Sequence, residues 1–220
     1  MLPKAPSDVR SESEDDDADI APFRVGRAAS NRCSRSSRDG RMNLRDRLRT
    51  GTRRAQDSAA QAYGRLDVSG ADGLAAFLSA HLDTVAALLG AKGKAAPPPA
   101  MVTARAALDA DLAALGRAAD PVKRRLPDPD DAVAREWLWH AMQMGLRPAA
   151  RDRAIAADTD PALGDAGHYL SLPRDVAGFR TLCSMLEAEP GYGAQADRIL
   201  AAANAWFVLF ETAAHDRARR

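Results

Sequence analysis

The chain has 220 residues, and its 31 Lys and Arg nearly balance its 30 Asp and Glu, which gives a net charge of +1 at pH 7. So small a charge provides no overall field that would favour nucleic acid or a membrane surface as a partner. The two cysteines, Cys33 and Cys183, fit no metal or redox spacing and are too few for a disulfide framework. The chain has no apolar run of about 20 residues and no apolar signal region at its N-terminus, so we expect a cytoplasmic protein.

The first part of the chain differs in texture from the rest. The acidic block SESEDDDADI is followed by RVGRAASNRCSRSSRDGR, which is rich in Arg and Ser. Large apolar residues are too scarce here to offset the entropy cost of ordering the chain. We therefore predict a disordered charged tail over residues 1–42. Two alternatives remain: the tail is a regulatory arm that binds a partner or the domain's own surface, or translation starts at Met42.

From Asn43 onward the pattern is helical. Apolar residues recur at three- and four-residue spacing, Ala is abundant, and strong strand formers are scarce. The spacing predicts helices over 44–66, 74–90, 101–116, 131–148, 149–157, 161–170, 173–189 and 194–220, with Pro148 ending or kinking the fourth. We predict one all-α domain of about seven to eight helices over residues 43–220.

No general catalytic or metal-binding motif is present. The sequence has no Gly-rich phosphate loop with a Lys, no HExxH, no CxxC and no GxSxG. Its four histidines, His81, His140, His168 and His215, have no second His at a ligand spacing. The sequence therefore predicts no catalytic residue and no metal site.

One segment is unusual for this chain. REWLWHAMQMGLRP, residues 135–148, combines two Trp, two Met and a His. Such side chains line ligand pockets, but they also build ordinary core helices. Trp137 and Trp139 differ by two positions and point to different sides of a helix, so we expect one in the core and the other exposed, where it would suggest a partner surface.

The phrases LRTGTRRAQDSAA, DGLAAFLSAHLDTVAALL, ARAALDADLAALG and ILAAANAWFVLFETAA occur in this order along the chain. In order and spacing they resemble the heme oxygenase family, in particular its bacterial biliverdin-producing branch, which is often associated with bacteriophytochromes. The resemblance covers about Leu44 to Ala214. It implies a helical fold that holds heme between its first helix and a glycine-containing distal helix.

The sequence departs from the family pattern at the iron ligand. The family's first helix reads approximately LRxxTRxxH, and its His is the axial ligand. Leu48, Arg49, Thr52 and Arg53 match this pattern, but Gln56 stands at the position of the His. Heme iron is normally held by His, Cys, Met or Tyr, and Gln is not a competent substitute.

A second departure lies in the distal helix, where the family has approximately YVLEGSxLG. Aligning Met144 and Gly145 with its LG places His140, Ala141 and Met142 at the EGS. Glycine is used where a ligand approaches the backbone closely. The resemblance therefore implies a degenerate member in which Met142 projects into the heme space.

The resemblance marks five positions as equivalents of the heme pocket: Gln56, His140, Met144, Phe207 and Phe210. His140 or Met144 could ligate iron from the distal side, because both residue types are known axial ligands. Simple core packing is the alternative for each. Four arginines of the first helix, Arg45, Arg49, Arg53 and Arg54, either meet heme propionates or form a solvated face.

Three functions compete. The first is a heme oxygenase-like protein that has lost heme cleavage and serves as a binding or regulatory module, with a protein partner or a second copy of itself, in a bacteriophytochrome-type signalling pathway. It needs no cofactor, and heme or biliverdin are the candidate ligands. The second is an active heme oxygenase with a non-standard ligand such as His140. In the third, the charged tail carries the function and the helical domain is a dimerising platform.

Overall fold

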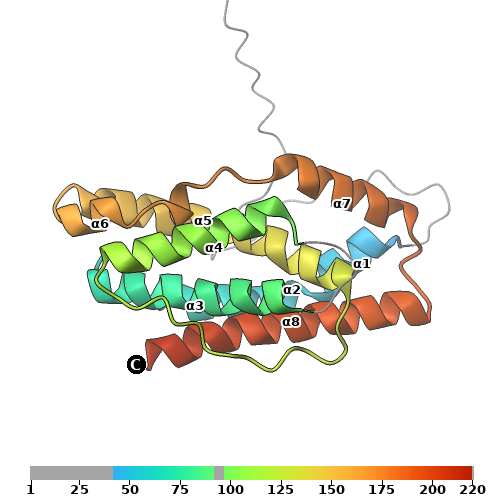
Figure 1. The fold of residues 1–220 in the computed structure, drawn as a ribbon. Helices are drawn as coiled ribbons and strands as arrows, with labels where there is room; N and C mark the ends of the chain where they lie inside the picture. The colour runs from blue at the N-terminus through green and yellow to red at the C-terminus, as the bar shows by residue number, and fades with distance from the viewer. Residues whose placement is uncertain (1–41, 92–96, 220) are drawn as a thin grey trace, which may run out of the picture.

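The computed structural model describes residues 42–91 and 97–219. Over these residues the chain forms eight α-helices, one short 3-10 helix and no β-strand (Figure 1). The predicted all-α fold and the predicted number of helices are therefore confirmed. The predicted tail, residues 1–42, lies outside the described residues except for Met42.

The helices follow one another along the chain with short connections, except between the fourth and the fifth. Their bounds are α1 Leu44–Gly51, α2 Arg53–Tyr63, α3 Ala71–Gly90, α4 Pro99–Ala114, α5 Ala132–Ala157, α6 Pro161–Asp165, the 3-10 helix η1 Tyr169–Ser171, α7 Val176–Ala188 and α8 Ala194–Ala218.

The first predicted helix is divided in two at Thr52. Asn43 caps α1, as expected, because its side chain accepts a hydrogen bond from the backbone N–H of Asp46 at 2.8 Å. The buried Thr52 hydroxyl donates to the carbonyl of Leu48 at 2.7 Å. Such a bond back to the preceding turn bends a helix, and α2 starts at the next residue.

Helix α5 runs through Pro148 without interruption, so the predicted separate helix over 149–157 is wrong. Pro148 lies on an exposed part of α5, where water can satisfy the carbonyl that loses its partner. The helix beyond it is held by tertiary contacts. Ala149 is buried, and the Arg153 guanidinium donates to the carbonyl of Leu163 at 2.8 Å.

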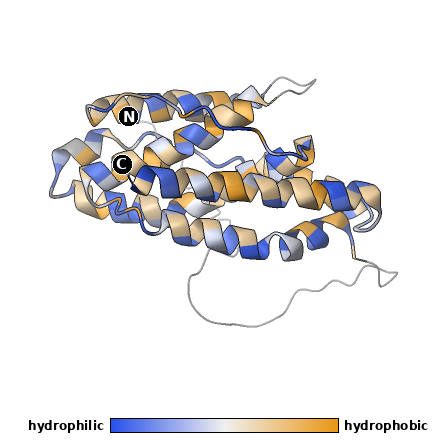
Figure 2. Cartoon of the chain, turned by 90° about the horizontal axis from the view of Figure 1, so that it is seen from below, coloured by the Kyte–Doolittle hydropathy of each residue, from blue (hydrophilic) through white to orange (hydrophobic). Residues whose placement is uncertain are grey.

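Helix α8 is the main packing partner in the bundle. It runs along one side of the molecule beside α2 and α3, while α7 lies on the opposite side over α1 and α5 (Figure 1). Apolar and polar residues alternate along the helices (Figure 2), as amphipathic packing requires.

Helix α3 is long and apolar enough to cross a membrane by length and composition. However, 67% of its most apolar window is buried within the bundle, as in the core helix of a soluble protein.

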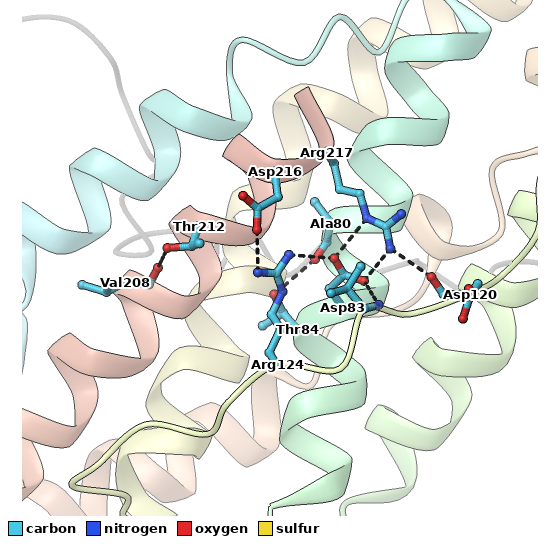
Figure 3. A network of polar contacts seen from close by, with 10 residues as sticks. Ala80, Asp83, Thr84, Asp120, Arg124, Val208, Thr212, Asp216 and Arg217 are labelled. Carbon is cyan, nitrogen blue, oxygen red and sulfur yellow. Dashed lines mark hydrogen bonds and ion pairs between the residues drawn. The ribbon is translucent and has the colours of Figure 1, made fainter. Parts of the chain in front are cut away.

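The long connection between α4 and α5 is fixed by one buried carboxylate (Figure 3). Asp83 of α3 is fully buried and accepts hydrogen bonds from the Val122 N–H at 2.8 Å and from the Arg124 guanidinium at 2.9 Å. Arg217, near the end of α8, donates to the same carboxylate at 2.7 and 3.0 Å. Arg124 also pairs with Asp216 at 3.0 Å. The network therefore joins α3, the connection and the end of α8.

Candidate functional site: a central cavity

Four helices, α2, α3, α5 and α8, enclose a cavity of about 210 Å³, here called the central cavity. It lies between α2 and α5, the two helices that carry the phrases aligned above with the proximal and distal helices of heme oxygenases. Phe207 and Phe210 of α8 close one side, and Phe77 and His81 of α3 close another.

Small side chains on the two facing helices leave this space open. Ala141, Gly145 and Ala149 of α5 line the cavity at four-residue spacing, and therefore from one face of that helix. Ala59 and Ala60 line it from α2. The segment 135–148 thus combines the two predicted roles: it packs in the core, and it also forms one wall of a cavity.

The exposed lining residues mark the place where the cavity opens to solvent. Gly64, Pro148 and Asp152 all line the cavity and are exposed. Among the lining residues that the structure describes there is no Arg or Lys, and Asp152 is the charged one. The cavity is therefore better suited to a neutral ligand than to an anion.

The deep end of the cavity is aromatic. Tyr63 stacks on Phe210 with ring centroids 4.1 Å apart and an interplanar angle of 26°. The imidazole of His81 lies 4.7 Å from the Tyr63 ring and 4.5 Å from the Phe77 ring, measured between centroids. These rings offer a planar aromatic ligand edges and faces with which to pack.

His81 is the titratable group of this deep end. It is 2% exposed, and burial lowers the pKa of its imidazole from 6.5 to about 3, so the ring is neutral at physiological pH. Its Nδ1 lies 2.8 Å from the hydroxyl oxygen of Tyr169. This is the one polar contact of the His81 ring among the described residues.

Tyr169 is itself held in place by a second buried carboxylate. Asp111 of α4 is fully buried and accepts hydrogen bonds from the backbone N–H groups of His168 and Tyr169, at 2.9 and 2.8 Å. The His168 imidazole Nδ1 lies 2.8 Å from the same carboxylate. Asp111 thereby fixes η1 and sets the place of the Tyr169 side chain beside His81.

The ring of Tyr63 borders the cavity, but its hydroxyl is shielded from water and does not face this space. This hydroxyl is buried and has no hydrogen-bond partner of good geometry in the part of the chain that the structure describes. Burial raises the pKa of Tyr63 well above its usual value, and the Thr84 hydroxyl offsets only part of this rise. A buried hydroxyl without a well-aligned partner costs free energy.

Three of the five predicted pocket residues line the cavity: Gln56, Phe207 and Phe210. Gln56 does not present its amide nitrogen to the cavity as a free group, because this nitrogen donates to the Thr52 hydroxyl at 2.7 Å. The indole N–H of Trp137 reaches the same hydroxyl at 3.3 Å. Gln56 is thus tied to the bend between α1 and α2.

The other two, His140 and Met144, do not line the cavity. His140 is 3% exposed, and its ring lies toward α7, with its centroid 5.4 Å from that of Phe179. Burial lowers the pKa of His140. Met144 is half-buried. Met142 of the same helix, which is 2% exposed, does border the cavity.

Neither tryptophan of the segment is exposed: Trp137 is 7% and Trp139 is 3% exposed, so the prediction of one surface Trp is wrong. Both fit inside because α5 is covered on more than one side. Trp139 borders a second, smaller cavity of about 160 Å³, together with Gln143 and Tyr169.

Three of the four candidate arginines of the first two helices form ion pairs outside the cavity. Arg45 pairs with Glu187, Arg49 with Asp46 and Arg53 with Asp57. None of the four candidate arginines lines the central cavity. A propionate inside this cavity would therefore find no guanidinium.

His81 and Tyr63, which line the cavity, and Tyr169, which contacts His81 from outside it, were not predicted as site residues. The sequence pointed to this group only through His81, a His within an otherwise apolar helix. Asp111 and Tyr169 lie far from His81 in the sequence, and only the fold brings them close to it. In the described part of the chain there is no group of three or more His, Cys, Asp or Glu that could hold a metal ion. Comparison with family models, curated proteins and solved structures gave no match to this chain.

Proposed function

We propose that this protein is a non-catalytic binding module, built on a plan like that of the heme oxygenases, whose central cavity takes a small neutral ligand. The observation that carries the proposal is the cavity itself, which lies between α2 and α5 and combines apolar walls with the His81 imidazole, whose Nε2 has no partner among the described residues. Concave apolar sites with few polar groups are the usual form of ligand pockets.

The size and charge of the central cavity count against heme as its ligand. Its volume of about 210 Å³ is below the roughly 300–1,000 Å³ of pockets that bury drug-sized ligands, and heme is larger than most of these. No lining cation would meet the propionates, and Asp152 stands at the opening. Gln56 is bonded to Thr52 rather than free. The same arguments of size and charge count against biliverdin.

The scale of the cavity indicates its ligand. An apolar protein cavity of about 150 Å³ takes up benzene or xenon. The central cavity is somewhat larger, which suits one or two fused rings. A regulatory module would bind such a molecule and pass on its presence to a protein partner or a second copy of the chain in the cytoplasm. That signalling role comes only from the family resemblance.

Naphthalene is a suitable probe, because it is neutral, planar and of two rings. We would titrate it into the full chain with 13C-labelled Met methyl groups and follow their NMR signals. The methyl of Met142, which borders the cavity, should shift in a saturable manner, while Met144 on the same helix serves as an internal control. Saturable binding that shifts Met142 supports the proposal. No binding, or shifts confined to other methionines, would overturn it.

A further inference from the structure

The proton positions on the His81–Tyr169 pair identify the chemistry of the ligand. Tyr169 is 1% exposed, and burial raises the pKa of its hydroxyl, so this hydroxyl keeps its proton. The two groups share a single contact, from the Tyr169 hydroxyl oxygen to His81 Nδ1 at 2.8 Å. Either the Tyr169 hydroxyl donates to Nδ1, or Nδ1–H donates to the hydroxyl oxygen.

The two arrangements differ in what they leave without a partner. If Nδ1–H were the donor, the buried Tyr169 O–H proton would need another acceptor, and no such acceptor contacts it among the described residues. If the Tyr169 hydroxyl donates, its proton is satisfied by Nδ1. A buried donor without an acceptor costs free energy, so the arrangement in which the Tyr169 hydroxyl donates to Nδ1 is the stable one. The neutral His81 ring then carries its own proton on Nε2.

With the proton on Nε2, His81 provides a hydrogen-bond donor at the deep end of the cavity. His81 lines the cavity, and its Nε2–H has no acceptor in the described part of the chain. The Tyr63 ring lies beside this donor, with its centroid 4.7 Å from that of His81. The surroundings are aromatic and contain no cation.

We propose that the central cavity selects a neutral, planar aromatic molecule of one or two rings that carries a hydrogen-bond acceptor, and that the acceptor is bound by His81 Nε2–H at the deep end. This inference rests on the proposed function and specifies its ligand. Tyr169 is a positioning residue, because it fixes which nitrogen of His81 carries the proton, and Asp111 acts through Tyr169.

An organic cation fits less well, although aromatic cages are known to bind such ions. The carboxylate of the lining, Asp152, is at the exposed opening and not at the aromatic end. A cation in the deep end would lose its hydration without a counter-charge, and it would face the Nε2–H donor of His81 rather than an acceptor. Charge and hydrogen bonding therefore both favour the neutral acceptor.

The test compares two probes of nearly equal shape, naphthalene and quinoline, which differ by one ring nitrogen that accepts a hydrogen bond. Both are titrated into the full chain at a pH where quinoline is neutral, for the natural sequence and for His81→Phe. We expect the ratio of quinoline affinity to naphthalene affinity to fall about tenfold in His81→Phe, because a single hydrogen bond is lost. The ratio is compared because the substitution also changes the shape of the cavity wall and can therefore change the affinity for both probes.

The ratio of quinoline affinity to naphthalene affinity tests the donor role of His81, whereas binding of either probe tests the proposed function. If both probes bind and the ratio is the same in both proteins, the donor role of His81 is overturned while the small-ligand cavity stands. If neither probe binds the natural protein, the proposed function fails as well.

A second measurement keeps the inference testable if His81→Phe does not fold. In the natural protein with 15N-labelled histidine, His81 should show a protonated Nε2 and a bare Nδ1, and quinoline should shift the Nε2–H proton downfield. Tyr169→Phe should give a mixture of the two neutral forms. A His81 ring protonated on Nδ1 in the natural protein would overturn the assignment.

Discussion

His81 Nδ1 lies 2.8 Å from the Tyr169 hydroxyl oxygen, in a part of the core where both side chains are almost fully buried. The pair joins α3 to η1 and places a neutral imidazole at the wall of the central cavity. Because the imidazole is buried, the stability of the protein should depend on pH. Because it borders a cavity, it should also affect the affinity for a ligand.

The buried imidazole should make the protein sensitive to acid. Folding lowers the pKa of His81 from 6.5 to about 3, so between these values the unfolded chain binds the proton more readily. The contribution of His81 to stability is therefore complete above pH 6.5 and is lost as the pH falls toward 3. Between pH 7 and 5 this loss is about 2 kcal/mol.

Urea unfolding at several pH values measures this effect. The natural protein should lose more stability between pH 7 and 5 than His81→Phe does. Phe77→Leu is the matched control, since it lowers stability in the same region but removes no titrating group. Equal pH slopes for the natural protein and His81→Phe would show that His81 is not buried in neutral form.

Asp83 should be among the costliest polar residues to change. Asp83→Asn leaves the nearly buried guanidinium groups of Arg124 and Arg217 without their shared carboxylate (Figure 3). Breaking a buried pair from one side costs about 3–5 kcal/mol. Denaturant unfolding measures this loss. Asp216→Asn is the control, because Asp216 is 38% exposed and pairs with Arg124 alone, so we expect about 0–1 kcal/mol there.

The helices could be predicted from apolar spacing, because a helix that packs in a bundle repeats its apolar residues whatever its partners are. The division at Thr52 and the continuity through Pro148 could not, since both depend on contacts made after folding. Thr52 is bonded by Gln56 and Trp137, and the end of α5 is held by Arg153.

The candidate site was predictable in part. Gln56, Phe207 and Phe210, which the resemblance marked, border the central cavity. The pairing of His81 with Tyr169 spans 88 positions along the chain and carries no local signal. His140 was favoured because of its place in an unusual segment, yet the rotation of α5 turns its ring toward Phe179.

Gly145 offers a way to separate stability from binding. A Cβ added at this position meets no atom within 4 Å, because it faces open space on α5. Gly145→Ala should therefore stabilise the protein by about 0.5–1 kcal/mol, as expected when glycine is replaced within a helix. Gly145→Leu should instead reduce naphthalene affinity at least tenfold, because its side chain can fill the cavity. Thermal unfolding and the Met142 titration check the two effects, and unchanged naphthalene affinity in Gly145→Leu would contradict the location of the ligand.

Restoring the family's iron ligand should not restore heme binding. Gln56→His supplies an imidazole at the position aligned with the axial His, but it changes neither the volume of the cavity nor its lack of cations. We expect no stoichiometric hemin complex from this variant by absorbance titration. If Gln56→His alone bound hemin tightly, the cavity would have to open more readily than its packing indicates, and the missing ligand would be the main obstacle.

The central claim is that the cavity takes a small neutral ligand and not heme, and a hemin titration of the natural full chain tests it most directly. Absorbance is followed from 350 to 700 nm, first with hemin alone and then with ascorbate added. Our account predicts no saturable shift of the Soret band and no bilin product. A one-to-one hemin complex with a shifted Soret band, and above all its conversion to biliverdin, would contradict it.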